Sequence, residues 1–375
     1  MARLLARSAA AWLVAAILAG PVWPAEKWRQ SYFYDKDNSS LTLNDLQFPS
    51  AAHGIAAGYL DTKGKSKPVA VTTTDGGAHW TIANLPDIPV SMFFLNETTG
   101  WMVTPKAIWQ TTDGGHDWHD LPKSPKLLMS AYFLDESRGF AIGAHKLAYQ
   151  TEDGGKNWTP IAAAEEPHSD PEYTVYNHIT FVNGKVGMIS GFAAPPRKGD
   201  DGKPDWLDPK SSTARREWPH LSIMLDTRDG GKTWKSSTAS MFGRITRNMF
   251  LPDGRGLGLI EFTDTFKWPS EVHLIDATTG KSSIVYHAAD RAITDILLLP
   301  SGTGYMAGVE VVGQMQHSPI PRKVVILKSE NLSDWTEMPV DYRATAVQVM
   351  LRAAADGSLW AATDNGMILK LTVTP

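Results

Sequence analysis

Four aspartates with the same neighbours are the first candidates for chemistry in this sequence. They lie in the octapeptides TTDGGAHW (73–80), TTDGGHDW (111–118), TEDGGKNW (151–158) and TRDGGKTW (227–234), as Asp75, Asp113, Asp153 and Asp229. Carboxylates serve as metal ligands and as general acids or bases, so four of them could form a catalytic or metal site. The spacings of 38, 40 and 76 residues argue against this, because a repeat places one aspartate in each structural unit.

The octapeptide itself predicts a turn between two strands. An aspartate carboxylate can accept backbone N–H bonds across a hairpin, glycine supplies positive φ, and tryptophan offers a large apolar face. We therefore predict a structural role for twelve recurring positions: Asp75, Gly77, Trp80, Asp113, Gly115, Trp118, Asp153, Gly155, Trp158, Asp229, Gly231 and Trp234.

Other signatures of metal or cofactor chemistry are weak. The eleven histidines are scattered, with no H-x-x-x-H or H-E-x-x-H spacing. Residues 200–205 are rich in aspartate, but Lys203 lies among them and the spacing departs from a calcium-binding loop. No phosphate-binding glycine motif is present, so we expect no metal and no cofactor.

Composition excludes further classes of protein. The 375 residues carry a net charge of −4 and are 42% hydrophobic, which is typical of a globular chain and not of a cationic nucleic-acid binder. The absence of cysteine excludes disulfides, thiolate metal sites and a lipid anchor on an N-terminal cysteine.

The first 25 residues have the pattern of a secretory signal. Arg3 and Arg7 precede an uncharged apolar stretch at 9–20, and cleavage after Ala25 is expected. Trp23 is large for the position three residues before that site, so a retained membrane anchor is the alternative. Both interpretations predict an exported, periplasmic or extracytoplasmic protein.

A second repeat, two strands joined by a short turn, organises the rest of the chain. It occurs seven times, at 46–58, 91–103, 130–143, 179–191, 247–260, 294–308 and 347–362. With the octapeptide turn it gives units of four strands, A to D, which predicts an all-β, seven-bladed β-propeller over 26–375. The seventh unit lacks strand D, and residues 27–35, with Trp28 near their start, are predicted to supply it and close the ring.

The octapeptide resembles the Asp-box, or BNR repeat, of sialidase-like propellers. Together with the F-x-(D/N)-x-x-x-G-(W/F) strands and the export signal, it resembles the photosystem II assembly and stability factors, the Ycf48/Hcf136-like BNR proteins. That resemblance implies a non-enzymatic scaffold that binds a protein partner, with a membrane complex among the candidates. Separately, we expect the protein to be monomeric.

A sialidase-like propeller that binds or hydrolyses glycans is the alternative. The chain has no R-I-P motif, and sialidases have six blades where this sequence predicts seven. Hydrolysis needs two carboxylates across the scissile bond. The acidic candidates cluster in one polar stretch and could equally be a solvated surface: Asp200, Asp201, Asp205, Asp208 and Glu217.

The functional surface is predicted on the face where the B–C and D–A connections emerge, which we call the loop face. Three consecutive blades have long B–C connections there, at 194–221 in blade four, 263–270 in blade five and 312–322 in blade six. Long loops on a rigid scaffold often carry function, and tryptophan and arginine dominate binding hot spots. The candidate partner-binding residues are Trp206, Trp218, Trp268 and His317, with a basic arc of Lys126, Arg244, Arg291 and Arg343. The alternative is that these are ordinary solvated loop residues.

Overall fold

The computed structural model describes residues 25–195, 218–263, 266–311 and 322–374. Within these ranges the helices are two short 3-10 turns, η1 (Ala162–Ala164) and η2 (Pro171–Tyr173), and the rest of the regular structure is β-strand. No helix of the described part is long and apolar enough to cross a membrane. Of the predicted signal segment, only Ala25 lies within the described residues.

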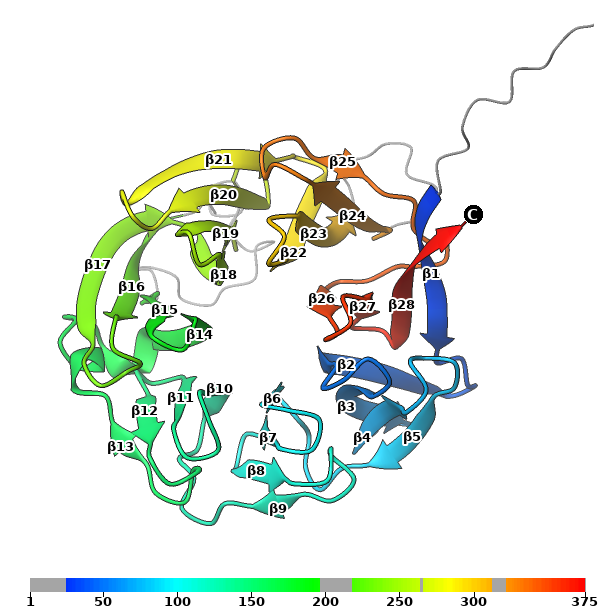
Figure 1. The fold of residues 1–375 in the computed structure, drawn as a ribbon, viewed down its shortest axis with the longest axis horizontal. Helices are drawn as coiled ribbons and strands as arrows, with labels where there is room; N and C mark the ends of the chain where they lie inside the picture. Colours follow the sequence, from blue (N-terminus) through cyan, green and yellow to red (C-terminus); the bar gives the residue numbers. More distant parts are fainter. Residues whose placement is uncertain (1–24, 196–217, 264–265, 312–321, 375) are drawn as a thin grey trace, which may run out of the picture.

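Seven four-stranded antiparallel sheets stand around a common axis as the blades of a propeller (Figure 1). This confirms the predicted all-β, seven-bladed fold. Strand A of each blade lies nearest the axis and strand D lies at the rim. Blades one to four are β2 (Ser39–Gln47), β3 (Gly54–Thr62), β4 (Lys65–Thr73), β5 (Thr81–Asn84); β6 (Ser91–Phe94), β7 (Gly100–Val103), β8 (Ile108–Thr111), β9 (His119–Asp120); β10 (Leu128–Phe133), β11 (Gly139–Gly143), β12 (Ala148–Thr151), β13 (Thr159–Pro160); and β14 (Thr174–Val182), β15 (Val186–Ala193), β16 (Pro219–Thr227), β17 (Lys235–Phe242).

Blades five to seven continue the same order and meet the N-terminus. They are β18 (Arg244–Phe250), β19 (Arg255–Glu261), β20 (Ser270–Asp276), β21 (Lys281–His287); β22 (Arg291–Leu298), β23 (Gly304–Glu310), β24 (Val324–Ser329), β25 (Thr336–Glu337); and β26 (Val349–Ala353), β27 (Leu359–Thr363), β28 (Met367–Thr374), β1 (Ala25–Phe33). The first strand pairs antiparallel with the last, from Ala25 opposite Thr374 to Phe33 opposite Met367, so the predicted closure of the ring is confirmed.

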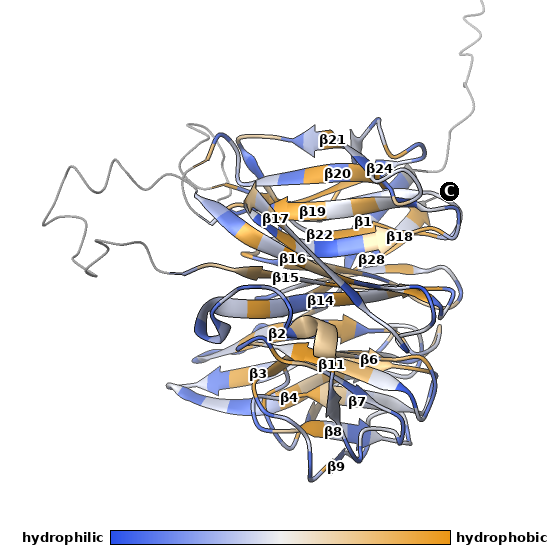
Figure 2. Ribbon diagram, turned by 90° about the vertical axis from the view of Figure 1, so that its left-hand side faces the viewer, coloured by the Kyte–Doolittle hydropathy of each residue, from blue (hydrophilic) through white to orange (hydrophobic). Residues whose placement is uncertain are grey.

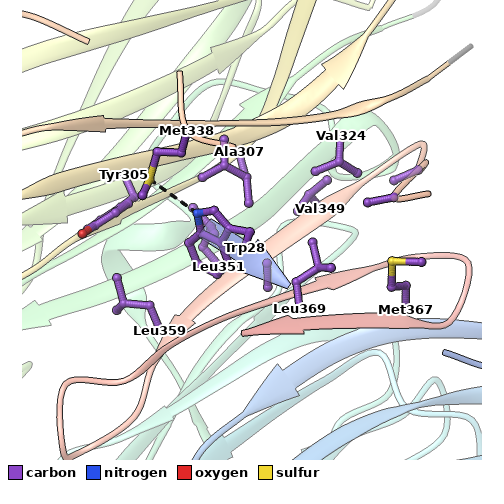
Figure 3. Packing of buried hydrophobic residues seen from close by; sticks show 14 of the residues in the cluster. Trp28, Tyr305, Ala307, Val324, Met338, Val349, Leu351, Leu359, Met367 and Leu369 are labelled. Atoms are coloured by element: carbon purple, nitrogen blue, oxygen red, sulfur yellow. Dashed lines mark hydrogen bonds between the residues drawn. The ribbon is translucent and has the colours of Figure 1, made fainter. Parts of the chain in front are cut away.

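Trp28 joins two blades rather than starting a strand as the sequence suggested. It is the fourth residue of β1, and its indole ring is fully buried in a cluster contributed by blades six and seven (Figure 3). Its indole N–H points at Met338 Sδ, 3.4 Å away. Its backbone N–H donates to Pro339 O at 2.9 Å, and its carbonyl accepts from Asp341 N at 2.9 Å. The closing strand therefore also binds the connection that leads from blade six to blade seven.

A close contact between phenylalanine and glycine explains the F-x-x-x-x-x-G spacing of the repeat. Gly139 begins β11 opposite Phe133, the last residue of β10, and a Cβ on this glycine would lie 2.4 Å from the Phe133 ring. Phe133 in turn stacks on Trp101 of the preceding blade, with ring centroids 3.5 Å apart. The same contact recurs in four other blades, in the pairs Gly54–Phe48, Gly100–Phe94, Gly187–Phe181 and Gly256–Phe250.

Gly139→Ala is expected to lower the free energy of unfolding by about 1–3 kcal/mol, the usual cost of overpacking a core. The ring of Phe133 cannot give way easily, because Trp101 lies flat against its other face. Chemical denaturation at neutral pH measures the effect. Gly184→Ala provides a contrast, because no atom lies within 4 Å of its Cβ position and only its positive φ opposes the change. Equal wild-type stability in Gly139→Ala would contradict the packing argument.

The A–B and C–D turns lie on the face opposite the loop face, which we call the turn face. In blades one to four a glycine N–H of the octapeptide donates to a carbonyl of the A–B turn, each at 2.8 Å: Gly76 to Ala52, Gly114 to Thr98, Gly154 to Ser137 and Gly230 to Lys185. The octapeptides are thus bound to their own blades on the turn face.

Candidate functional site

The octapeptide aspartates each serve their own turn. In blade three, Asp153 Oδ1 accepts hydrogen bonds from Thr151 Oγ1 and from the backbone N–H of Asn157, both at 2.9 Å. Gly155 N donates to Thr151 Oγ1 at 2.9 Å, which completes the turn. The other three octapeptides repeat this arrangement. Among the described residues, no group of three or more histidine, aspartate or glutamate side chains is placed to hold a metal ion.

These bonds favour the ionised carboxylate. The side chain and backbone N–H of Asn157 lower the pKa of Asp153 to about 2, and similar bonds from Thr233 lower that of Asp229 to about 2. Because the folded-state pKa is below the unfolded value, the resulting stability is present above pH ~4 and is lost as the pH falls towards 2.

Asp153→Asn is therefore expected to flatten the acid side of the stability profile while leaving the turn intact. Blade six supplies the precedent, because Asn331 holds the equivalent place and its Oδ1 accepts from Ser333 N at 2.9 Å and Asp334 N at 2.8 Å. Melting temperatures measured from pH 7 to pH 2.5 should fall less for the variant than for the wild type. A variant curve parallel to that of the wild type would show that this carboxylate does not contribute to acid unfolding.

The octapeptide tryptophans pack across aromatic rings of their own or the preceding blade. Trp118 contacts Phe94 and Trp234 contacts Phe140 edge to face, with ring centroids 6.1 and 5.5 Å apart. The D strands start one residue after each tryptophan, at Thr81, His119, Thr159 and Lys235, and not at the tryptophan as the sequence suggested. The backbone of each tryptophan therefore lies outside strand D, and its indole ring packs against the neighbouring aromatic rings.

The three tryptophans and the histidine predicted for the loop face fall into three groups. Trp206 and His317 lie outside the described residues. Trp218, directly before β16, is 56% exposed. Trp268 is held in place, because its indole N–H donates to Glu271 Oε1 at 2.7 Å and its ring stacks on His287 with centroids 3.9 Å apart.

A set of phenylalanines that sequence reasoning missed lies beside Trp268. Phe266 stacks on Phe262 with centroids 4.1 Å apart and on Phe242 at 5.9 Å, and it meets Trp268 edge to face. Phe242 ends β17 and is 47% exposed. The B–C connection of blade five reads EFTDTFKWPS, and its three aromatic residues were the signal that could have revealed this cluster. We call Trp218, Phe242, Phe262, Phe266 and Trp268 the loop-face aromatic cluster.

The residues of the predicted basic arc differ in how many carboxylates lie beside them. Arg291 faces three carboxylates, with Asp290, Glu310 and Glu337 at 2.8, 3.7 and 3.6 Å, and Arg343 pairs with Asp341 at 2.8 Å. Lys126 is exposed two residues before β10.

Arg244 is the member of the arc that borders the aromatic cluster. It begins β18 directly after the Phe242–Gly243 turn. Its guanidinium carbon lies 4.5 Å from the centroid of the Phe192 ring, and its buried Nε has no hydrogen-bond partner among the described residues. An arginine held by an aromatic face and with an unused donor is well suited to bind an acceptor group.

A second group of charged residues, close to the ring axis, was not anticipated at all. β-Bulges in β2 and β22 direct Asp45 and Asp295 towards the following blade. Asp45 Oδ2 accepts from Met92 N at 2.7 Å, and Asp295 Oδ2 accepts from Leu351 N at 2.8 Å. Both carboxylates are almost fully buried, at 4% and 1% exposure.

Arg352 bridges these two carboxylates across three blades. Its Nη2 donates to Asp45 Oδ1 at 2.7 Å and its Nη1 donates to Asp295 Oδ2 at 3.2 Å. Arg247 binds the other oxygen of Asp295 at 3.2 Å. We call Asp45, Asp295, Arg247 and Arg352 the axial network, which connects blades five, six, seven and one. Its two arginines neutralise its two aspartates, so it presents no net charge to a ligand.

Two further titratable groups lie near the axial network. Burial and the charge of Arg247 lower the pKa of His178 to about 3, so the imidazole is neutral at pH 7 and its Nε2 lies 3.0 Å from Asn248 O. Burial raises the pKa of Glu261 at the loop-face end of β19, although its carboxylate accepts a 2.9 Å bond from Thr246 Oγ1.

Comparison with known proteins gives partial sequence matches and whole-fold matches. No family model matches the chain. A stretch of 128 residues, 30% of this chain and 35% of the relative, is 30% identical to the photosystem II assembly lipoprotein Ycf48 of Synechococcus sp. (strain CC9902). The Ycf48 of Trichormus variabilis is 26% identical over 34% of this chain and 41% of its own length. These matches span about a third to two fifths of the relatives.

Solved structures extend the likeness to the whole ring. A structure described as YCF48 bound to D1 peptide matches with a TM-score of 0.58 at 17% identity, over 93% of this chain and 99% of that one. YCF48 from Cyanidioschyzon merolae gives the same TM-score at 15% identity, over 92% and 98% of the two chains. The chain therefore shares the propeller fold of these Ycf48 structures. An ancestral GH74 enzyme also shares the fold of this chain, with a TM-score of 0.56 at 11% identity over 91% of this chain and 46% of its own.

Proposed function

We propose that this propeller is an exported, non-enzymatic scaffold that binds a protein partner through its loop face. The observation that carries the proposal is the loop-face aromatic cluster, in which Trp218 and Phe242 are exposed and Arg244 follows two residues after Phe242. Exposed aromatic side chains next to an arginine are the usual composition of a protein-binding hot spot. The partner is a segment that offers apolar side chains with a carboxylate, or another acceptor, for Arg244.

The likeness to Ycf48 supports a protein as the ligand. The relatives are named as photosystem II assembly factors, and one solved relative is described as bound to a D1 peptide. We extend this to a membrane complex as the larger assembly, reached from the exported side of the membrane. The signal pattern at residues 1–25 supports export.

A pull-down from solubilised host membranes with the tagged protein tests this proposal. The loop-face variant Phe242→Ser/Arg244→Ala should lose at least tenfold of the partner recovered by the wild type. The matched control, Val186→Ser/Arg138→Ala, removes an exposed apolar residue and an exposed arginine on the turn face and should recover the partner normally. Circular dichroism must show both variants folded. Loss in the control alone would place the site on the turn face, and a wild type without partners would contradict the scaffold itself.

A propeller that binds or hydrolyses glycans is the second candidate. The shared fold with a GH74 enzyme favours it, and burial raises the pKa of Glu261, which is the direction that a general acid requires. The acidic residues that the sequence offered as partners for such chemistry, Asp200 to Asp208 and Glu217, lie outside the described residues. Release of reducing sugar from a glycan panel, abolished by Glu261→Gln, would establish the enzyme and exclude the non-enzymatic scaffold.

A further inference from the structure

The outer strand of blade four differs from the outer strands of the other blades. β9, β13 and β25 have two residues each and β5 has four, so these edges offer little backbone for pairing. β21 is interrupted by a bulge near Ile284. β1 carries a bulge, three charged residues and backbone bonds to Pro339 and Asp341. β17 has eight residues, pairs with β16 without a bulge and contains no proline.

The β17 edge is also open and uncharged. Its sequence is KSSTASMF, so no charge occurs between Ser236 and Phe242, and six of its eight residues are exposed. It lies at the rim of the ring, on the side that faces the viewer in Figure 2, and within the described residues its ladder partner is β16. Proteins usually protect such edges with charge, proline, bulges or short strands, and an unprotected one is a template for another strand.

A neighbouring connection limits the part of the edge that is available. Ser236 Oγ binds Glu166 Oε2 of the segment that leads from blade three to blade four. A groove of about 290 Å³ separates this segment from residues 236–238. Residues 237–241 extend beyond this hydrogen bond, and Ser237 and Thr238 line the groove.

We propose that residues 237–241 of β17 pair antiparallel with the same residues of a second copy of this chain. A two-fold axis at Ala239 places Ala239 opposite Ala239, Thr238 opposite Ser240 and Ser237 opposite Met241 of the other copy. Each pair contains at least one small side chain, and no charged side chain lies opposite another of the same sign. The result is an isologous dimer in which two four-stranded blades form one eight-stranded sheet.

The edge favours a second copy over other occupants because it is complementary to itself. An acidic or basic partner segment would find no opposite charge between Ser236 and Phe242. Pairing at the rim also leaves the loop face and the turn face of both rings free. The dimer is thus independent of partner binding at the loop face, although it differs from the monomer that the sequence analysis expected.

Sedimentation velocity over a concentration series up to roughly 100 µM tests the dimer, since a reversible dimer dissociates on dilution by mass action. Ala239→Lys places two like charges directly opposite each other across the axis and should weaken dimerisation at least tenfold. Ala83→Lys is the matched control, because Ala83 is an exposed alanine within the outer strand β5, and it should dimerise as the wild type does.

Cross-linking locates the contact. The natural chain has no cysteine, so Ala239→Cys introduces a single thiol, and a short bis-maleimide should join two copies, whereas Ala83→Cys should remain unlinked. A wild type that stays monomeric throughout the series would overturn the proposal. So would a dimer that Ala239→Lys leaves unchanged, or one that forms only after residues 196–217 are deleted, since the insertion would then occupy the edge.

Discussion

Arg352→Met should destabilise the propeller by roughly 3–5 kcal/mol, measured as the free energy of urea unfolding at pH 7. The guanidinium is the shared partner of Asp45 and Asp295, and both carboxylates are almost fully buried. Methionine fills much of the same volume but leaves Asp45 without an opposite charge. An uncompensated buried carboxylate is far more costly than the loss of the ion pair alone would suggest.

The matched control for this prediction is Arg138→Met. Arg138 pairs with Asp135 at 2.8 Å, but both side chains are nearly half exposed, so the expected loss is below about 1 kcal/mol. A second variant separates charge from packing: adding Asp45→Asn to Arg352→Met should restore part of the lost stability by removing the unpaired charge. Equal losses for the Arg352 and Arg138 variants would show that the axial network contributes no more than a surface pair.

Trp28→Ala should have an effect of similar size, about 3–5 kcal/mol, because it removes a fully buried indole from the joint between two blades. The cavity would lie between Tyr305 and Met338 of blade six and Leu351 of blade seven (Figure 3). Ring closure depends on this joint, so unfolding should also become less cooperative, with a lower slope against denaturant.

Phe33→Ala tests whether the effect belongs to the buried joint. Phe33 ends the same strand but is 43% exposed, so its removal leaves no comparable cavity and should cost far less. A Trp28→Ala protein as stable as Phe33→Ala would mean that β1 closes the ring through its backbone pairing with β28 alone. Closure of the ring would then not depend on the packing of the Trp28 side chain.

Much of the architecture follows from the sequence because its determinants are local and repeated. The octapeptide turns depend on residues four apart, as in Thr151, Asp153 and Gly155, so a short window contains the whole hydrogen-bonded unit. The contact between Phe133 and Gly139 joins residues six apart across a single turn. Seven repeats of two strands joined by a short turn, with a spare strand at the N-terminus, are sufficient to predict a closed propeller.

The candidate site was only partly accessible from the sequence. Trp218, Trp268 and Arg244 were found from long connections and residue type, because binding loops are enriched in tryptophan and arginine. The distinction between Arg244, which retains an unused donor, and Arg291, which faces three carboxylates, depends on residues from separate strands. Residue type alone could not separate them.

The sequence by itself determined the repeat, the blade count and the turn chemistry, since each rests on contacts within about ten residues. The tertiary structure alone decided the axial network and the joint at Trp28. Arg352 and Asp45 are 307 positions apart, and Trp28 and Met338 are 310 positions apart, yet each pair is in direct contact. Closing the ring brings the first and last blades together. No local sequence pattern predicts which of their side chains will then be in contact. The energies of these contacts depend on burial, which only the closed ring creates.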